Sequence, residues 1–193
     1  MSSNGQFLVL ADAVMKPGSE NNTEVKSISF QVFPRERFIN AKDKLSTPAT
    51  YWTNWARWSI VVRPEQLHSM QGCPVPLISD DGEFLLLLQT GFISANDHVL
   101  EIYRCDHSAS KGASSTNLGV FVKGLSLKEF WPTSELPSRG TMWTDESPQW
   151  FADGSFIFSS DDRQLIHKTR WGNSVRINLT DRSVSAVADG TAK

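Results

Sequence analysis

The sequence has few cysteines, no long apolar run and almost no excess charge, and each shortage excludes a class of protein. Two cysteines in 193 residues are too few for the disulfide framework of a small secreted domain. The longest apolar run, Phe84 to Leu88, has the length of a strand and falls far short of the roughly 20 residues that cross a bilayer. The formal net charge of -2 favours no polyanionic partner. We therefore expect neither an integral membrane protein nor a nucleic-acid-binding protein.

Familiar catalytic and cofactor-binding motifs are also missing. The chain has no G-x-S-x-G nucleophile elbow, no phosphate-binding glycine loop and no H-E-x-x-H zinc pattern. Its first residues lack the basic segment of a secretion signal, so we expect a cytoplasmic protein on the premise that Met1 is the true start. From sequence we assign no catalytic residue, no metal and no cofactor.

The composition is that of a folded domain. Hydrophobic residues make up 39% of the chain and charged residues 21%, far from the balance of a disordered segment. A chain of this length can bury most of the surface that its unfolded form exposes. We predict one β-rich domain over residues 1–193, either complete or a fragment of a longer chain.

A short turn followed by an apolar strand recurs along the chain. Asn4-Gly5, Asp81-Gly82 and Asp153-Gly154 each supply a residue suited to the positive φ of a tight turn, and a Phe follows two residues after each glycine. A fourth copy, residues 159–167, has Asp162 in place of the glycine. The repetition predicts that equivalent turns precede equivalent strands.

The strands that follow these turns are of two kinds. Alternation places Val175, Ile177 and Leu179 on one face of a strand, and the same pattern holds for Ile28, Phe30 and Val32. Residues 7–10 and 84–88 are apolar on both faces, which predicts central strands buried from both sides. Helix signals are short: a start at Pro34, another at Pro64, and the capping box formed by Ser126 and Glu129.

Two stretches, Ile78-Ser79-Asp80-Asp81-Gly82-Glu83-Phe84-Leu85 and residues 158–166, resemble the "strand, Ser-x-Asp-Gly, strand" unit of bacterial WD-like β-propellers of the TolB type. The resemblance covers about half of the chain and none of residues 41–76. It implies an all-β fold with antiparallel sheets in a partial or small propeller-like arrangement, and the alternative is a β-sandwich. It also implies a platform that binds another protein.

The densest aromatic feature is the segment 51–58. On a strand, Trp52 and Trp58 share one face and Trp55 takes the other, so that indole rings and Arg57 could offer a binding surface to a protein partner. The alternative is that these large aromatics fill the core, which is the favoured interpretation because tryptophan is highly buried on average.

Two groups of polar residues could bind metal ions, but other interpretations are favoured for both. His68, Cys73, Cys105 and His107 are the residue types of a zinc site, but their spacing is irregular, and unrelated core thiols and surface imidazoles are favoured. The acidic pairs at residues 80–81, 145–146 and 161–162 could hold a cation, but turn formation explains them better.

The sequence thus favours a non-enzymatic, propeller-like module that binds another protein through Trp52, Trp55, Arg57 and Trp58 or through its loops. The first alternative is a hydrolase in which turn aspartates act with a histidine, for which the candidates are His68, His98, His107 and His167. The second is a small inhibitory or immunity-type protein. Partner, process and number of blades are not encoded in any motif.

Overall fold

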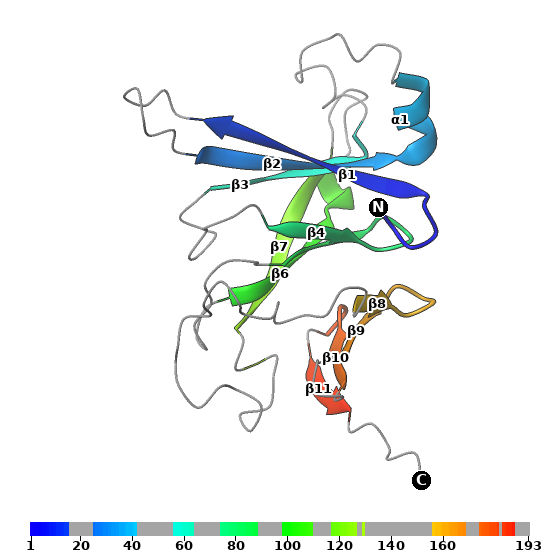
Figure 1. Ribbon diagram of the computed structural model, residues 1–193, viewed down its shortest axis with the longest axis vertical. Helices are drawn as coiled ribbons and strands as arrows, with labels where there is room; N and C mark the ends of the chain where they lie inside the picture. Colours follow the sequence, from blue (N-terminus) through cyan, green and yellow to red (C-terminus); the bar gives the residue numbers. More distant parts are fainter. Residues whose placement is uncertain are drawn as a thin grey trace, which may run out of the picture. The chain divides into compact units, whose positions relative to one another are not determined.

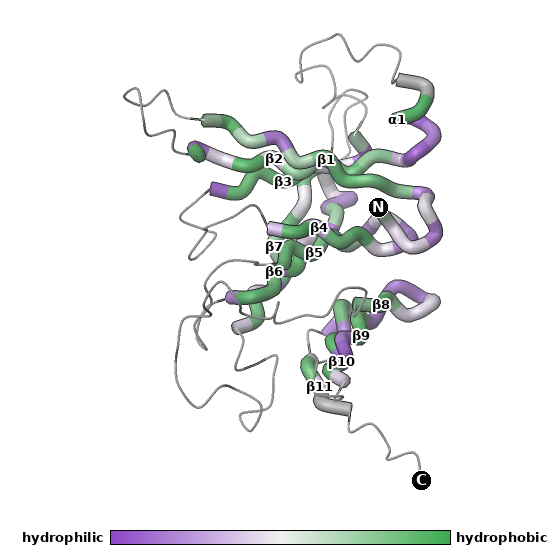
Figure 2. The backbone as a smooth tube through the Cα atoms, in the orientation of Figure 1, coloured by the Kyte–Doolittle hydropathy of each residue, from purple (hydrophilic) through white to green (hydrophobic). Residues whose placement is uncertain are grey.

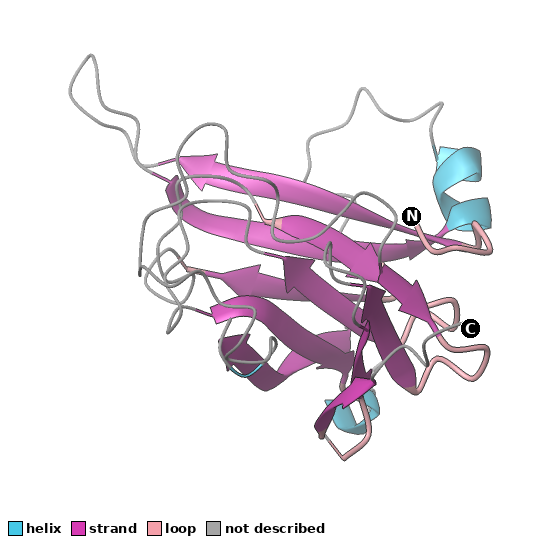
Figure 3. Ribbon diagram, turned by 60° about the horizontal axis from the view of Figure 1, so that its bottom comes forward, coloured by secondary structure: helices cyan, strands magenta, loops and turns pink. Residues whose placement is uncertain are grey.

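The fold is all-β, as predicted, in a computed structural model of the chain (Figure 3). The structure describes residues 1–15, 25–41, 56–63, 74–88, 98–109, 117–126, 129, 156–168, 174–181 and 183–187. Within these residues, no helix has the length and apolar character needed to cross a membrane. The chain divides into two compact units, residues 1–68, 76–86 and 103–121 in the first, and residues 69–75, 87–102 and 122–193 in the second.

Seven strands form the larger sheet, in the order β1-β2-β3-β7-β6-β5-β4. In chain order these are β1 (Phe7–Met15), β2 (Val25–Pro34), β3 (Trp58–Val62), β4 (Val75–Ile78), β5 (Phe84–Leu88), β6 (His98–Cys105) and β7 (Asn117–Ser126). β1, β2 and β3 run side by side (Figure 1).

Four strands form the second sheet: β8 (Phe156–Phe158), β9 (Gln164–Lys168), β10 (Ser174–Asn178) and β11 (Val184–Val187). Their order follows the chain, and each pair is antiparallel. Val175, Ile177 and Leu179 are buried and Arg176 is exposed, which confirms the predicted alternation.

The larger sheet also contains a parallel pair, which the sequence analysis did not predict. β1 and β3 both run antiparallel to β2, but β3 and β7 are parallel, with Ser59 opposite Leu118. The reason lies in the connection, because β4, β5 and β6 come between β3 and β7 in the chain before β7 takes its place beside β3. Such a pair cannot be made by a hairpin, and no local turn signal predicts it.

The two apolar strand segments predicted to be central, residues 84–88 and 7–10, differ in their burial. All five residues of β5 are buried, with at most 1% of any of them exposed. The continuous apolar run of β5, which is hydrophobic in Figure 2, predicts this burial. The prediction that residues 7–10 form a central strand is wrong: they begin the edge strand β1 and are half-buried. An apolar run therefore did not distinguish an edge strand from a central one.

The predicted short helix after Pro34 is confirmed as α1 (Arg35–Ala41). Proline suits this boundary because its fixed φ is compatible with a helix start and its missing N–H is not needed there. Phe38 of α1 meets Phe33 of β2 edge to face, with ring centroids 6.3 Å apart. At the predicted capping box, the carboxylate of Glu129 accepts hydrogen bonds from the backbone N–H and the hydroxyl of Ser126 at 2.9 and 2.8 Å.

Within the described part of the chain, the recurring turn is one structure found three times, in residues 2–7, 79–84 and 159–164. We call it the Ser-Asx turn and number its residues one to six. The serine at position one donates its N–H to the carbonyl of position six, at 2.9, 3.0 and 2.8 Å in chain order. Its carbonyl accepts the N–H of position four at 3.0, 3.0 and 2.8 Å. Its hydroxyl accepts the N–H of position six at 3.0, 2.9 and 2.9 Å.

The Asn or Asp at position three completes each turn. Its side-chain oxygen accepts the serine hydroxyl at 2.8, 2.6 and 2.5 Å, and the N–H of position five at 2.9, 2.9 and 3.1 Å. These bonds lower the pKa of Asp161, the hydroxyl of Ser159 contributing most. A sixth bond joins the carbonyl of position five to the N–H of Arg35, Cys105 or Leu179, at 2.7, 2.9 and 2.8 Å.

Position four has the left-handed backbone that the sequence predicts. Gly5 and Gly82 have φ of 71° and 70°, and Asp162, which replaces glycine in the third copy, has φ of 54°. Phe7 and Phe84 begin β1 and β5, as expected. Asp153-Gly154 lies outside the described residues, although Phe156 does begin β8. The prediction that a tight turn precedes each strand is therefore confirmed for the copies that the structure describes, although β1 is an edge strand and β5 is not.

Candidate functional site

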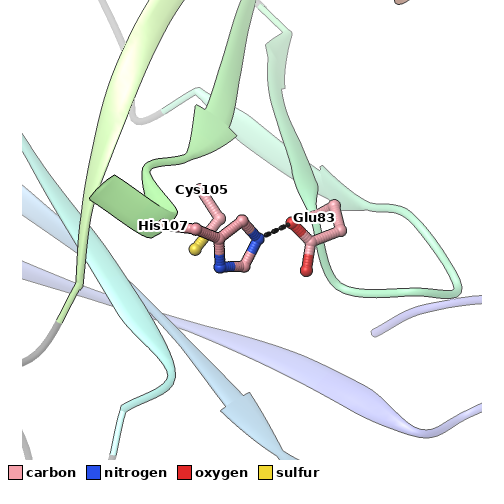
Figure 4. A group of neighbouring side chains, drawn as sticks. All are labelled: Glu83, Cys105 and His107. Carbon is pink, nitrogen blue, oxygen red and sulfur yellow. Dashed lines mark hydrogen bonds and ion pairs between the residues drawn. The ribbon is translucent and has the colours of Figure 1, made fainter. Parts of the chain in front are cut away.

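Three side chains of the types that bind metals meet in the first unit, where the second Ser-Asx turn lies beside the end of β6. They are Glu83, Cys105 and His107, and one ligand atom from each lies within 4.8 Å of the others (Figure 4). Glu83 directly precedes β5, Cys105 is the last residue of β6, and His107 opens a short 3-10 helix, His107–Ala109.

Backbone hydrogen bonds place these residues. The N–H of Cys105 donates to the carbonyl of Glu83 at 2.9 Å, so the two residues are held side by side. The next residue, Asp106, donates its N–H to the carbonyl of Leu118 at 2.9 Å, and its carboxylate accepts the N–H of Ser108 at 2.8 Å. Hydrogen bonds from Ser108 lower the pKa of Asp106. This turn directs the ring of His107 towards Glu83.

Glu83 is the centre of the polar contacts. One carboxylate oxygen lies 2.5 Å from Nε2 of His107, and the other forms an ion pair with the guanidinium of Arg57. Arg57 also donates to the carbonyl of Asp81 at 2.7 Å, and its guanidinium lies 5.2 Å from the centre of the Phe7 ring. The carboxylate is therefore held from both sides.

The three side chains of the cluster differ in their exposure to solvent. The side chain of His107 is 60% exposed and that of Glu83 19%, while Cys105 is 2% exposed. Figure 4 shows the second ring nitrogen of His107 on the side of the Cys105 sulfur. One side of the imidazole thus faces a carboxylate and the other a thiol, an arrangement that can share a proton or bind a cation.

The structure describes two of the four residues that the sequence proposes as a binding surface, Arg57 and Trp58. Trp58 is fully buried, and its indole N–H donates to the carbonyl of Gly82 at 2.7 Å, so it packs in the core and offers no surface to a partner. Arg57 is half-buried and belongs to the Glu83 cluster. Trp52 and Trp55 lie outside the described residues.

The structure brings together half of the possible zinc ligands. Cys105 and His107 are neighbours, whereas His68 and Cys73 lie outside the described residues. Sequence reasoning missed Glu83 because it treated the residues around Gly82 only as turn formers. The C-x-H spacing at the end of an apolar strand was the available signal, but nothing local indicates which distant carboxylate faces it.

The turn interpretation of the acidic pairs is confirmed where the structure describes them. Asp81 and Asp161 hold the Ser-Asx turns together, and residues 145–146 lie outside the described part. Asp80 has a different role: its carboxylate accepts the hydroxyl of Ser3 at 2.5 Å and the N–H of Asn4 at 2.8 Å. Burial raises its pKa, but the bonds from Ser3 and Asn4 together outweigh that effect, and the pKa is lowered.

Two of the candidate histidines of a hydrolase are placed differently from each other. His167 is fully buried, and its ring stacks on Phe156 with centroids 4.4 Å apart. His107 reaches a carboxylate, but that carboxylate belongs to Glu83 and not to a turn aspartate.

Exposed apolar residues lie on one face of the paired strands β3 and β7. A Cβ on Gly119 would meet Ile60 and Trp58, so residue 119 faces the buried side and Leu118 and Val120 face the other. Leu118, Val120 and Val61 are 60%, 47% and 63% exposed. We call this the outer face.

The edge of β1 is exposed as well. Residues 11–15 are all exposed, and within the described residues no strand pairs with the side of β1 that faces away from β2. Val14 and Met15 are 46% and 43% exposed.

Comparison with known proteins adds no family. No protein-family model matches the chain, and no curated protein sequence matches it significantly. The arguments for function therefore rest on the geometry described above.

Proposed function

We propose that the chain is a propeller-like binding module that takes up an extended segment of another protein at the open edge of β1. The observation that carries the proposal is the exposure of five consecutive residues, 11–15, on a strand at the edge of its sheet. An edge strand presents a row of backbone N–H and C=O groups with which a further strand can pair.

β1 has few of the features that protect such an edge in other proteins. Its nine residues contain no lysine and no proline, and Asp12 is the single charged side chain among them. Its register with β2 shifts between Val14 and Met15, so regular pairing extends over residues 7–14. Val14 and Met15 would be covered by an added strand, which gives the partner apolar contacts besides backbone hydrogen bonds.

The propeller-like part of the proposal is supported by the second sheet and by the repeated turn. Four antiparallel strands in chain order are the composition of one propeller blade. The three Ser-Asx turns support a common ancestry of the strands they precede. A role for Trp52 and Trp55, a cytoplasmic location and the absence of nucleic-acid binding stay predictions.

The test compares two exposed valines that flank the same strand. Val14 of β1 and Val61 of β3 lie on the same face, paired with Ser27 and Ser29 of β2. A lysine at the edge opposes strand addition. We expect Val14→Lys to abolish binding of the partner recovered with the full-length chain, and Val61→Lys to leave it unchanged.

Hydrogen exchange on the purified complex then locates the contact. Strand addition predicts new protection of the backbone amides of residues 11–15 in the complex. Loss of binding through Val61→Lys instead, with protection in β3 and β7, would assign the partner to the outer face and overturn the proposal. Protection of residues 11–15 that grows with protein concentration and needs no partner would show that a second copy of this chain occupies the edge, which also contradicts it.

A further inference from the structure

The geometry points to a zinc site formed by Glu83, Cys105 and His107, which is independent of the proposed partner binding. Within the described residues this is the one group of three potential metal ligands. The three donors are a carboxylate oxygen, a thiolate sulfur and an imidazole nitrogen, a mixture that favours Zn²⁺ over Mg²⁺ and Ca²⁺, which prefer oxygen alone.

The donor atoms are close to the positions that zinc requires. Bond lengths of about 2.0 to 2.3 Å at tetrahedral angles put donor atoms roughly 3.3 to 3.8 Å apart. In the structure they lie within 4.8 Å of one another, and Nε2 of His107 lies 2.5 Å from the Glu83 carboxylate. That pair must open by roughly 0.8 Å to admit the ion, and the ring must turn so that one nitrogen faces both the carboxylate and the sulfur. The shift is small for an exposed histidine ring.

Charge and exposure fit an ion that arrives from solvent. The thiolate and the carboxylate supply two negative charges against the one positive charge of Arg57, so the cluster attracts a divalent cation, and binding releases the Cys105 thiol proton to solvent. The exposed His107 lies on the solvent side of the cluster and the buried Cys105 on the inner side. Three protein ligands leave one position of the tetrahedron for water.

Arg57 is the residue that orients the carboxylate. Its guanidinium pairs with one oxygen of Glu83 and donates to the carbonyl of Asp81, so the other oxygen is directed at His107. Hydrogen bonds of this kind to a metal-binding carboxylate are common in zinc sites, and their loss lowers metal affinity by about 10- to 100-fold. Arg57 is therefore a positioning residue.

The experiment titrates the full-length chain with Co²⁺, which replaces zinc and reports its ligands by absorption. We expect a thiolate-to-cobalt charge-transfer band and the intense visible bands of tetrahedral Co²⁺, both removed by added Zn²⁺. The chain has two cysteines, which gives a matched pair of variants. The charge-transfer band should vanish in Cys105→Ser and persist in Cys73→Ser.

A second pair of variants tests the histidine. His107 is exposed, so His107→Ala should fold, and removal of a direct ligand should weaken Co²⁺ binding by at least the tenfold expected of an outer contact. His98, at the other end of β6, is the control, and His98→Asn should bind as the parent does. Circular dichroism checks the fold of each variant.

Three outcomes would overturn the inference: no cobalt spectrum in the unaltered chain, a charge-transfer band that depends on Cys73 and not on Cys105, or equal affinity in His107→Ala and His98→Asn.

Discussion

The second Ser-Asx turn should be far less tolerant of a methyl group at position four than the first. Gly5 and Gly82 have nearly the same φ, 71° and 70°, so alanine at either place suffers the same strain of a left-handed backbone, about 1–2 kcal/mol. The surroundings of the two glycines differ. A Cβ on Gly5 would meet Nη1 of Arg35 at 3.4 Å, the end of a flexible side chain.

A Cβ on Gly82 would instead lie 2.7 to 2.9 Å from three atoms of the Phe7 ring. That ring is confined, because Arg57 lies over it and the N–H and carbonyl of Phe7 bond to Ser2. Overpacking of this kind adds about 1–3 kcal/mol. We therefore expect Gly82→Ala to lower the free energy of unfolding by about 2–5 kcal/mol and Gly5→Ala by about 1–2 kcal/mol.

Urea denaturation followed by tryptophan fluorescence measures the difference. With a slope of about 2 kcal/mol per molar urea, the midpoint of Gly82→Ala should lie roughly 0.5 to 1.5 M below that of Gly5→Ala. The two variants change the same residue type at position four of two copies of the turn, both in the first unit, so each serves as the control for the other. Equal midpoints, or a lower midpoint for Gly5→Ala, would refute the argument that contact with Phe7 decides the cost.

Further predictions concern the serine, histidine and tryptophan side chains described above. Ser79→Ala removes the acceptor of a buried N–H and should lower the free energy of unfolding by about 1–3 kcal/mol. The more exposed Ser159→Ala should lower it by about 0.5–1.5 kcal/mol. Hydrogen exchange of the amides at residues 84 and 164 measures the two losses. Burial lowers the pKa of His167 to about 4, so between pH 6.5 and 4 the unfolded chain binds the extra proton. Stability should fall by about 3 kcal/mol as the pH drops through that window, and His167→Gln should flatten the dependence in thermal melts; a parent chain equally stable at both ends of the window contradicts this. Trp58→Phe loses the indole bond to Gly82 and should cost about 1–3 kcal/mol in urea denaturation, and a midpoint equal to that of the parent would contradict the role assigned to that bond.

Local chemistry made the turns and the strands that follow them predictable. Positive φ at Gly5, Gly82 and Asp162 and the helix after Pro34 follow from interactions within a few residues. The sequence pattern also predicted the alternation of Val175, Ile177 and Leu179.

Long-range placement was not predictable in the same way. The edge position of β1 and the parallel pairing of β3 with β7 depend on which strands meet, and residues 7–10 and 84–88 have the same apolar pattern. The cluster of Glu83, Cys105 and His107 was unpredictable for the same reason, because it also depends on which strands meet. Cys105 and His107 were recognised as a pair of ligand types, but their carboxylate lies 22 residues before Cys105 and is brought to them by strand pairing.

The Ser-Asx turn separates the residues that give it shape from those that are open to change. Its form depends on positions one, three, four and six, and the side chains at positions two and five take no part in it. In the turn of residues 79–84 these are Asp80 and Glu83. Asp80 accepts a hydrogen bond from the N-terminal turn, and Glu83 contacts Arg57 and His107. Both positions can therefore gain or lose contacts by single substitutions that leave the loop itself intact, and the copy at residues 159–164 offers the same two positions for engineering new contacts.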